Sequence, residues 1–197
     1  TVSFEKQTLL FGVAFNSDDL TDRTTAQTIP LDYSFNSFGL FLQDEIKLTK
    51  ITSILLSGRL DFHNEFGMFV TPRLSAMVRP SSSLTLRMGI GTGFKAPTIF
   101  VEEIEETRYQ NIRKLTNAVA ERSQSASFDV NWKTLIGELG ITTNAAVYLT
   151  NIDRALIADD ASLTNGILFL RNADDRTFSR GGEFSMKLAY DKFKFSL

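Results

Sequence analysis

Hydrophobic and polar residues alternate along most of this chain with a period of two, the side-chain spacing of a β-strand. The pattern is clearest in four segments, at 38–48, 54–62, 72–78 and 84–94. Their even-numbered positions are uncharged apart from Asp44, whereas their odd-numbered positions carry most of the charge. Each segment therefore has an apolar face and a charged face, as a strand with one buried side does.

The alternation returns over 123–132, 138–150 and 183–191, and a weaker version opens the chain over Val2–Phe15. No window shows a sustained period of 3.6 residues, so we expect no long helix. We predict one long strand from Leu168 to Tyr190, with a bulge at Gly181–Gly182. A stub follows at Phe193–Leu197, which makes eight full strands and part of a ninth.

Short and long connections alternate between these segments. The tight ones are Leu48–Ile51, Pro80–Ser83, Lys133–Gly137 and Asp191–Lys192, and the longer ones are Asn16–Tyr33, Asn64–Gly67, Phe94–Arg122 and Ile152–Asn165. An antiparallel up-and-down arrangement places all tight turns at one end and all long loops at the other. Two strands within 168–190 would put the Asp191–Lys192 turn at the long-loop end, which is why a single strand is predicted there.

What the apolar face contacts decides the fold class. In a soluble β-sandwich or small barrel it would form the core. Three features favour a transmembrane β-barrel instead: loops of unequal length at the two ends, glycines and serines on the polar face, and aromatic residues near the strand ends. These aromatic residues are Phe38, Phe62 and Phe94 towards the long loops, and Trp132 and Tyr190 towards the short turns. Asp44 falls on the apolar side, near enough to a short turn to lie at the membrane interface.

The stub indicates a fragment of a larger barrel, because single-chain bacterial barrels have even strand numbers. Composition agrees with an ordered β protein, since the 197 residues include 17 Phe but only one Trp and one His. A net charge of −2 gives no cationic field for nucleic acid. The absence of cysteine excludes disulfides and thiolate metal sites. No apolar run approaches the roughly 20 residues of a spanning helix, and no signal peptide is expected in the sequence.

One motif resembles a known family. The segment Gly91–Thr98 contains Gly93, Phe94, Lys95, Ala96 and Pro97. It is similar to the Gly-Phe-(Arg/Lys)-Ala-Pro strand end that precedes a long extracellular loop in TonB-dependent outer-membrane receptors. Other segments resemble the same family in the same order. These are Gln43–Glu45, Gly58–Asp61, Pro72–Arg73, Ala120–Ser123, and Asn172 followed by Ser179–Glu183, with Gly182 where Val or Ala is usual.

The resemblance implies part of a 22-stranded barrel with an N-terminal plug domain, energised by TonB across the periplasm. It implies import of a bulky, scarce nutrient, foremost a ferric siderophore, with haem, cobalamin or a glycan as other ligands of the family. The long loop after Lys95 resembles receptors of Bacteroidetes type. The implied partners are TonB, the plug domain of the same chain, the ligand and the lipid bilayer. The plug and the TonB box are not among these residues, and no cofactor is expected.

Charged residues on the polar face are the candidates for contact with a ligand or with the plug. They are Arg59, Asp61, His63, Arg73 and Arg87, with Arg79 in the same phase. The arginines could steer an anionic ferric chelate, or they could pair with carboxylates of the plug or of Asp61 and Glu45. Because there is no Gly-x-Ser-x-Gly motif, we expect His63 to be a lumen or rim residue, and we expect no enzymatic activity.

The segment Gly93–Pro97 is expected to be architectural. Its glycines permit a close turn at the rim, Pro97 ends the strand ladder, and Phe94 anchors in the outer aromatic girdle. Two acidic groups could hold Ca²⁺ or a cationic ligand, or could be solvated surface. They are the run Glu102, Glu103, Glu105 and Glu106, and the set Asp18, Asp19 and Asp22.

Ligand specificity is expected in three long loops, Asn16–Tyr33, Phe94–Arg122 and Ile152–Asn165, and in the upper lumen. Two alternatives remain. One is a complete small structural barrel of the outer membrane, which would have no plug and no transport role. The other is a soluble β-rich binding module, which would stay monomeric without detergent.

Overall fold

The computed structural model describes residues 1–23, 31–99, 115, 117–159 and 169–197, and within them every regular element is a β-strand. No helix in this described part of the chain is long and apolar enough to cross a membrane. In chain order the strands are β1 (Val2–Ser3), β2 (Gln7–Leu20), β3 (Tyr33–Lys47), β4 (Thr52–His63), β5 (Gly67–Val78), β6 (Leu84–Lys95), β7 (Glu121–Ile136), β8 (Leu139–Asp153), β9 (Leu156–Ala158), β10 (Leu170–Asn172), β11 (Thr177–Tyr190) and β12 (Phe193–Ser196).

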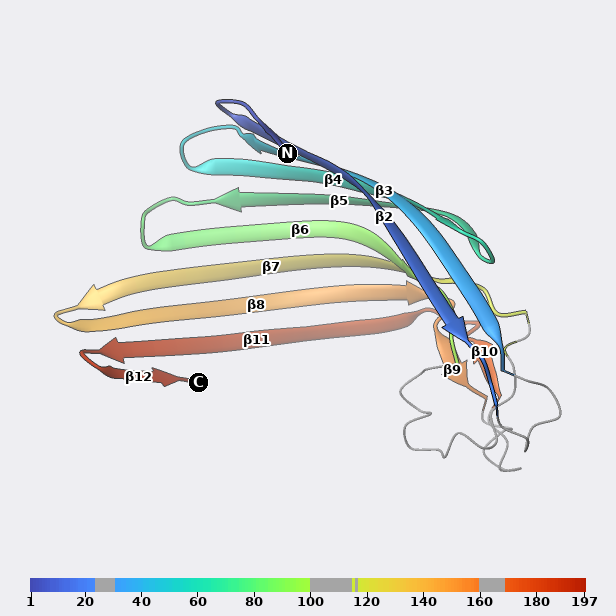
Figure 1. Ribbon diagram of the computed structural model, residues 1–197. Coiled ribbons are helices and arrows are strands. Elements are labelled where there is room, and N and C mark those ends of the chain that lie inside the picture. Colours follow the sequence, from blue (N-terminus) through green and yellow to red (C-terminus); the bar gives the residue numbers. More distant parts are fainter. Residues whose placement is uncertain (24–30, 100–114, 116, 160–168) are drawn as a thin grey trace.

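Ten strands form one antiparallel sheet, in the order β1-β2-β3-β4-β5-β6-β7-β8-β11-β12, and β9 pairs with β10 in a separate hairpin. Eight of the ten have 12–16 residues each, and β12 has four. Figure 1 shows these eight in a single curved layer, with short turns at one end, and the longer connections and the tight β4–β5 turn at the other. The predicted up-and-down sheet of eight strands and a stub is confirmed.

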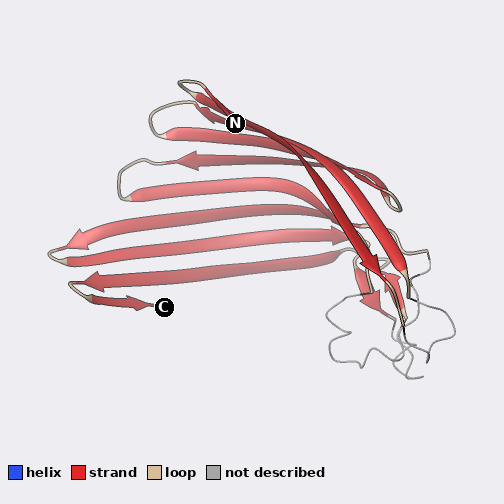
Figure 2. Cartoon of the chain, viewed as in Figure 1, coloured by secondary structure: helices blue, strands red, loops and turns tan. Residues whose placement is uncertain are grey.

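The two faces of the sheet differ as the alternation predicted. Residues paired across neighbouring strands share a face, so Leu56, Leu74 and Ile90 form one row on the apolar face. These three residues are 40–58% exposed, and Figure 2 shows no second layer of secondary structure against either face of the sheet. Arg59 and Arg87 occupy the alternate positions and lie on the polar face.

Large apolar side chains are exposed on every long strand of the described sheet, for example Phe11 and Val13 on β2 and Phe184 on β11. A soluble domain would place such a face against a second layer. An uncovered apolar surface of this extent is unfavourable in water and suits hydrocarbon. The packing therefore favours the membrane barrel over the soluble alternative.

The long strand expected from Leu168 to Tyr190 is not formed, and that prediction is wrong. Beyond Thr177, which pairs with Ile152, β8 has almost no residues left to accompany β11. The preceding residues of β10 pair with β9 instead. This extra hairpin leaves the Asp191–Lys192 turn at the short-turn end, so the reasoning about turn positions remains valid. There is also no bulge, because Gly181 and Gly182 pair in unbroken register with β8.

Two other boundaries differ from expectation. The opening segment forms two strands, β1 and β2, and β2 continues to Leu20 because it pairs with the extended start of β3. The connection Asn64–Gly67, expected to be long, is a tight turn between His63 and Gly67. Gly67 adopts a φ of 81°, which glycine tolerates without strain.

Aromatic side chains on the polar face pack over cross-strand glycines. Phe41 lies over Gly12, its partner on β2, and Tyr148 lies over Gly181, its partner on β11. A Cβ on either glycine would overlap the ring. These pairs give the polar face tight local packing in a sheet with no opposing layer.

The apolar face also carries charged residues. Arg180 on β11 pairs with Leu149 on β8, in the row that continues through Ala126 to Ile90. Asp44 lies close to Lys47, where β3 ends at a short turn, and its Oδ2 accepts a hydrogen bond of 2.7 Å from the Gln7 amide. The expected place of Asp44 at the membrane interface, where a carboxylate costs less than at the bilayer centre, stays a prediction.

The assignment of the two faces can be tested in a full-length barrel that contains this segment. Ile90→Arg places a charge at mid-strand on the apolar face, and we expect it to cost about 2–4 kcal/mol and to reduce folded protein in the membrane. Ser127→Arg, on the polar face opposite Gly89, should change folding by less than about 1 kcal/mol. Heat-modifiable electrophoretic mobility measures the folded fraction. Equal effects of the two substitutions would contradict the assignment.

Candidate functional site

The strongest ionic contact on the polar face joins Arg59 and Asp61 of β4. The Arg59 guanidinium donates to both carboxylate oxygens of Asp61 at 2.6–2.8 Å, and Asp61 is only 1% exposed. Gly39 lies opposite Asp61 on β3, and a Cβ there would collide with both side chains. Because Gly39 leaves this space, the ion pair lies close against the sheet, and Arg59 is not a free cation.

A second arginine on this face is also neutralised. Arg87 on β6 lies 3.0 Å from Asp129 on β7, and Asn144 on β8 donates a longer hydrogen bond of 3.4 Å to the same oxygen. Arg73, whose stem packs over Gly91, has no carboxylate partner among the described residues. Pairing of these arginines with carboxylates of the same chain was one of the two possibilities left open by the sequence. The structure shows such pairs for Arg59 and Arg87. Contact of these side chains with a plug or a ligand stays a prediction.

His63 ends β4 at the rim, one residue beyond the outward-facing Phe62. Its Nδ1 accepts the backbone N–H groups of Glu65 and Phe66 at 3.2 and 3.3 Å. Burial lowers the pKa of His63 below its ordinary value, so the ring is neutral at pH 7 and Nδ1 remains an acceptor. His63 therefore closes the turn between β4 and β5.

Phe94 was expected in the outer aromatic girdle, and this is wrong. Its ring stacks on Phe69, with centroids 3.9 Å apart and planes inclined by 3°. The ladder between β5 and β6 ends at the pair Arg73 and Gly91, so the last residues of β6 bend away from β5. Phe69 is 3% exposed and pairs with Asp61 in the phase of the polar face, so Phe94 packs on the polar side of the sheet.

The rest of the Gly93–Pro97 motif ends β6 and begins the next connection, as expected of an architectural segment. Gly93 lies opposite Ser123, and the Lys95 ammonium is 4.0 Å from Glu121 on β7. Ala96 is half-buried, and Pro97 is fully buried.

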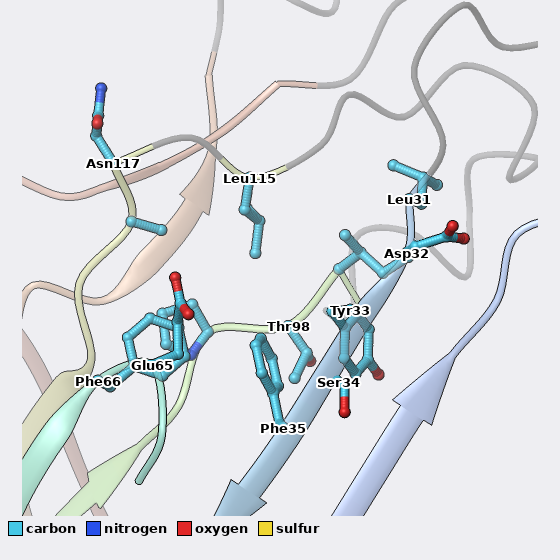
Figure 3. A pocket seen from close by; sticks show the side chains of 13 residues that line it. Leu31, Asp32, Tyr33, Ser34, Phe35, Glu65, Phe66, Thr98, Leu115 and Asn117 are labelled. Carbon is cyan, nitrogen blue, oxygen red and sulfur yellow. The ribbon is translucent and has the colours of Figure 1, made fainter.

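A cavity of about 410 Å³ opens at the long-loop end, above the polar face (Figure 3). Four segments line it: residues 31–35, the β4–β5 turn at 65–66, residues 97–99 after β6, and residues 115, 117 and 118 before β7. Pro97 and Thr98 lie in its wall, which connects the family-like motif with the cavity.

An aromatic cluster forms one side of this cavity. The ring of Phe35 lies 4.5 Å from that of Tyr33, 5.3 Å from that of His63 and 5.5 Å from that of Phe66. Sequence reasoning identified His63 alone. Tyr33 and Phe35 occupy odd positions of β3, the phase of the polar face, and large aromatic residues in that phase were the signal that was missed.

The Tyr33 hydroxyl donates to Asp18 Oδ2 at 3.2 Å. Burial, together with the Asp18 charge, raises the pKa of Tyr33 to about 12. Tyr33 is therefore a neutral phenol at physiological pH, and Asp18 is held beside the cavity wall.

Among the described residues, a cluster of buried apolar side chains lies at the long-loop end, apart from Phe69, which is buried on β5. Leu31, Ile99, Leu156 and Leu170 are each less than 10% exposed and pack together. They come from the β2–β3 connection, the segment after β6 and the β9–β10 hairpin. Figure 1 shows the ends of β2 and β3 close to this hairpin, although they belong to distant parts of the sheet. The core thus joins three connections into one unit beside the cavity.

Asn172 holds the same unit together by hydrogen bonds. Its Oδ1 accepts the N–H of Val119 at 2.9 Å, and its Nδ2 donates to the carbonyls of Val119 and Arg154 at 2.9 and 2.7 Å. The side-chain amide thereby pairs with Val119 much as a neighbouring strand would. Arg154 has a φ of 59°, which turns its carbonyl within reach. The family-like Asn172 therefore connects the segments before β7 and after β8.

Of the acidic residues considered for a cation, Asp18 accepts a hydrogen bond from the Tyr33 hydroxyl, Asp19 from the Ser17 hydroxyl, and Asp22 from the N–H of Leu31. In the described ranges no group of three His, Cys, Asp or Glu side chains is placed to hold a metal ion. The acidic run Glu102, Glu103, Glu105 and Glu106 lies outside the described residues.

Comparison with known sequences identifies relatives. The family described as TonB dependent receptor-like, beta-barrel, matches residues 1–197. An iron-regulated outer membrane virulence protein of Vibrio cholerae serotype O1 is 28% identical over 92 residues, which are 46% of this chain and 14% of that protein. The ferric enterobactin receptor PirA of Pseudomonas aeruginosa is 34% identical over 62 residues, which are 32% of this chain and 8% of that protein.

Solved structures have the same fold. The siderophore receptor PirA from Pseudomonas aeruginosa matches with a TM-score of 0.75 at 21% identity, over 96% of this chain and 35% of that one. A double mutant of the Serratia marcescens hemophore receptor HasR, solved with its hemophore HasA and heme, matches with a TM-score of 0.75 at 16% identity, over 93% of this chain and 36% of that one. At these identities the likeness shows the fold alone. The chain spans about a third of these receptors and a smaller share of the curated relatives.

Removal of Asp61 from a full-length barrel is expected to destabilise it. Asp61→Ala leaves the Arg59 guanidinium without its buried partner, and we expect a loss of about 2–4 kcal/mol of unfolding free energy. Urea unfolding in lipid vesicles measures it. Asp175→Ala, at an exposed bend, is the control, and the double variant Arg59→Met/Asp61→Leu should recover part of the loss. If Asp61→Ala is no worse than Asp175→Ala, the ion pair does not stabilise the sheet.

Loss of the Asn172 amide is expected to loosen the connections it joins. Asn172→Ala removes three hydrogen bonds, and Asn172→Asp retains an acceptor for Val119 N–H but places a carboxylate against two carbonyls. At about 1 kcal/mol for each bond, amide hydrogen exchange at Val119 should accelerate about tenfold or more in both variants. Exchange measured by mass spectrometry over 117–121 tests this, with Asn16→Ala on β2 as control. Unchanged exchange in both Asn172 variants would exclude the role.

Proposed function

This chain belongs to the TonB-dependent receptor family, as part of its β-barrel, and we propose that the receptor containing it imports ferric siderophores. The segment lies in the outer membrane of a Gram-negative bacterium. In this proposal its apolar face contacts lipid, its short turns lie in the periplasm, and its long connections face the exterior.

The observation that carries the proposal is the arrangement of the long connections. A barrel with a purely structural role would not need connections that pack together beside a cavity. Here the core of Leu31, Ile99, Leu156 and Leu170 gathers the connections beside an open space of about 410 Å³ with an aromatic wall. A space of this size, lined by aromatic groups with a few polar ones, is suited to binding a small molecule or part of a larger one.

The relatives support iron as the cargo. One relative is named as an iron-regulated outer membrane protein, and another as a ferric enterobactin receptor. A hemophore receptor with the same fold was solved with heme, so haem is the competing class of ligand. In the proposed mechanism the cavity at the long-loop end, called the mouth from here on, binds the chelate. The polar face of the sheet lines the passage below it. We infer no catalytic step, since the described side chains serve to pair, pack and cap turns.

The remaining partners follow from family membership. We infer that further strands close this sheet into a 22-stranded barrel, that a plug domain fills the lumen against the polar face, and that TonB supplies energy to the plug. Arg73, unpaired among the described residues, is then the first candidate for a plug or ligand contact, followed by Arg59, Asp61, His63 and Arg87.

Deletion of the full-length gene tests the proposal. During iron starvation, uptake of iron-55 from at least one ferric siderophore in a panel should fall below about a tenth of the parental rate, and the full-length gene should restore it. Uptake of haem and of cyanocobalamin should not change. Loss of haem or cobalamin uptake with every ferric siderophore unaffected would contradict the proposal.

A matched pair of substitutions in the complemented strain tests whether the cavity binds the imported chelate. Phe35→Ala removes the centre of the aromatic cluster and should weaken binding of the imported chelate to intact cells about tenfold. Phe178→Ala removes the same side chain from an exposed position on the apolar face and should leave binding unchanged. Equal binding by the two variants would place the ligand site elsewhere.

A further inference from the structure

The charge of the described lining of this cavity does not suit a strongly anionic ligand. Two ionisable groups other than tyrosine line the described cavity, Asp32 and Glu65, and both are exposed. Figure 3 shows them on opposite sides of the space, with the aromatic rings between them. Asp18 adds a third carboxylate behind the wall through its hydrogen bond with Tyr33. No lysine or arginine is among the described lining residues.

Among the described residues, three basic groups near these carboxylates do not compensate for them. His63, in contact with Phe66 at 4.9 Å between ring centroids, is neutral because burial lowers its pKa. Below the cavity, the buried Asp61 pairs with Arg59, and Asp129 pairs with Arg87. Of the described parts of the chain, an anionic chelate would therefore meet carboxylates at the entrance first, and Arg73 is an unpaired arginine of the polar face beneath them.

The aromatic wall has the same electrostatic preference. The faces of aromatic rings carry negative potential and attract organic cations, and nearby carboxylates strengthen this attraction. Tyr33, Phe35 and Phe66 present such rings to a space that also exposes the Glu65 carboxylate. The aromatic rings and the carboxylate therefore both favour a compact ligand that carries a positively charged group.

Ferric chelates differ in net charge according to their donor groups. Three catecholates, each with two negative charges, leave a tricatecholate complex of Fe³⁺ with a charge of −3. Three hydroxamates, each with one negative charge, neutralise Fe³⁺, and a pendant ammonium group then makes the complex cationic. We propose that this mouth selects ferric trihydroxamates bearing an ammonium group, and rejects tricatecholates. This inference rests on the proposed function and adds the class of siderophore.

Binding of iron-55 chelates to cells that express the full-length receptor tests the inference. The probes are ferrioxamine B, a trihydroxamate with one ammonium group, its N-acetylated form, which lacks that charge, and trianionic ferric enterobactin. We expect ferrioxamine B to bind at least about tenfold more tightly than the acetylated form, and ferric enterobactin to bind most weakly. Raising the salt concentration from 0.05 to 0.3 M should weaken binding of ferrioxamine B alone.

The double variant Asp32→Asn/Glu65→Gln identifies the groups responsible. It should reduce the preference for ferrioxamine B over its acetylated form to about threefold or less, while the acetylated form binds as before. Asparagine at 32 keeps an oxygen for the N–H of Asp22, so the loop contact is preserved. Asp175→Asn, outside the cavity lining, is the control, and heat-modifiable mobility shows that each variant is folded.

The outcomes separate this inference from the proposed function. Binding and uptake of ferric enterobactin in preference to ferrioxamine B would overturn the cationic selection and leave siderophore import intact. An unchanged preference in the double variant would overturn the role of Asp32 and Glu65. Uptake of haem or cyanocobalamin, with no binding of any of the three chelates, would overturn both the inference and the proposed function.

Discussion

Peptide groups placed in hydrocarbon have no solvent partner, so each N–H and C=O of a membrane-spanning strand must bond to a neighbouring strand. Ladders running from β2 to β8 and on to β11 meet this requirement along most of the length of the strands, except between β5 and β6, where only Arg73–Val78 and Leu86–Gly91 pair. The single layer, the tight turns at one end and the uncovered apolar face follow from it. A sheet built this way has no opposing layer, and therefore no central core.

Side-chain packing is consequently found in two other places. On the polar face, aromatic rings and an ion pair occupy spaces left by glycines, as Phe41 does over Gly12 and the Arg59–Asp61 pair does beside Gly39. At the long-loop end, leucines and an isoleucine from three connections form the buried core that the sheet lacks. The second location matters more for function, because it makes the connections around the cavity one packed unit, with Asn172 bonded between two of them.

Charged groups are also divided between these two places, the polar face and the long-loop end. Two arginines of the polar face are paired within the chain, so they stabilise the wall and do not present free positive charge. The mouth exposes carboxylates beside aromatic rings. The entrance and the wall below it therefore differ in charge among the described residues.

The sequence by itself determined the two faces of the sheet and most of its strands, although not the division of 168–190, because the direction of a side chain in a strand depends on its position along that strand. It also left His63 as a lumen or rim residue and placed Asp44 near a short turn. Only the tertiary structure decided the β9–β10 hairpin, the stacking of Phe94 on Phe69, the aromatic cavity and the contacts of Asn172. Each of these depends on which distant segments meet, and a pattern of period two has no information about contacts between residues that are neither adjacent in sequence nor paired in a ladder.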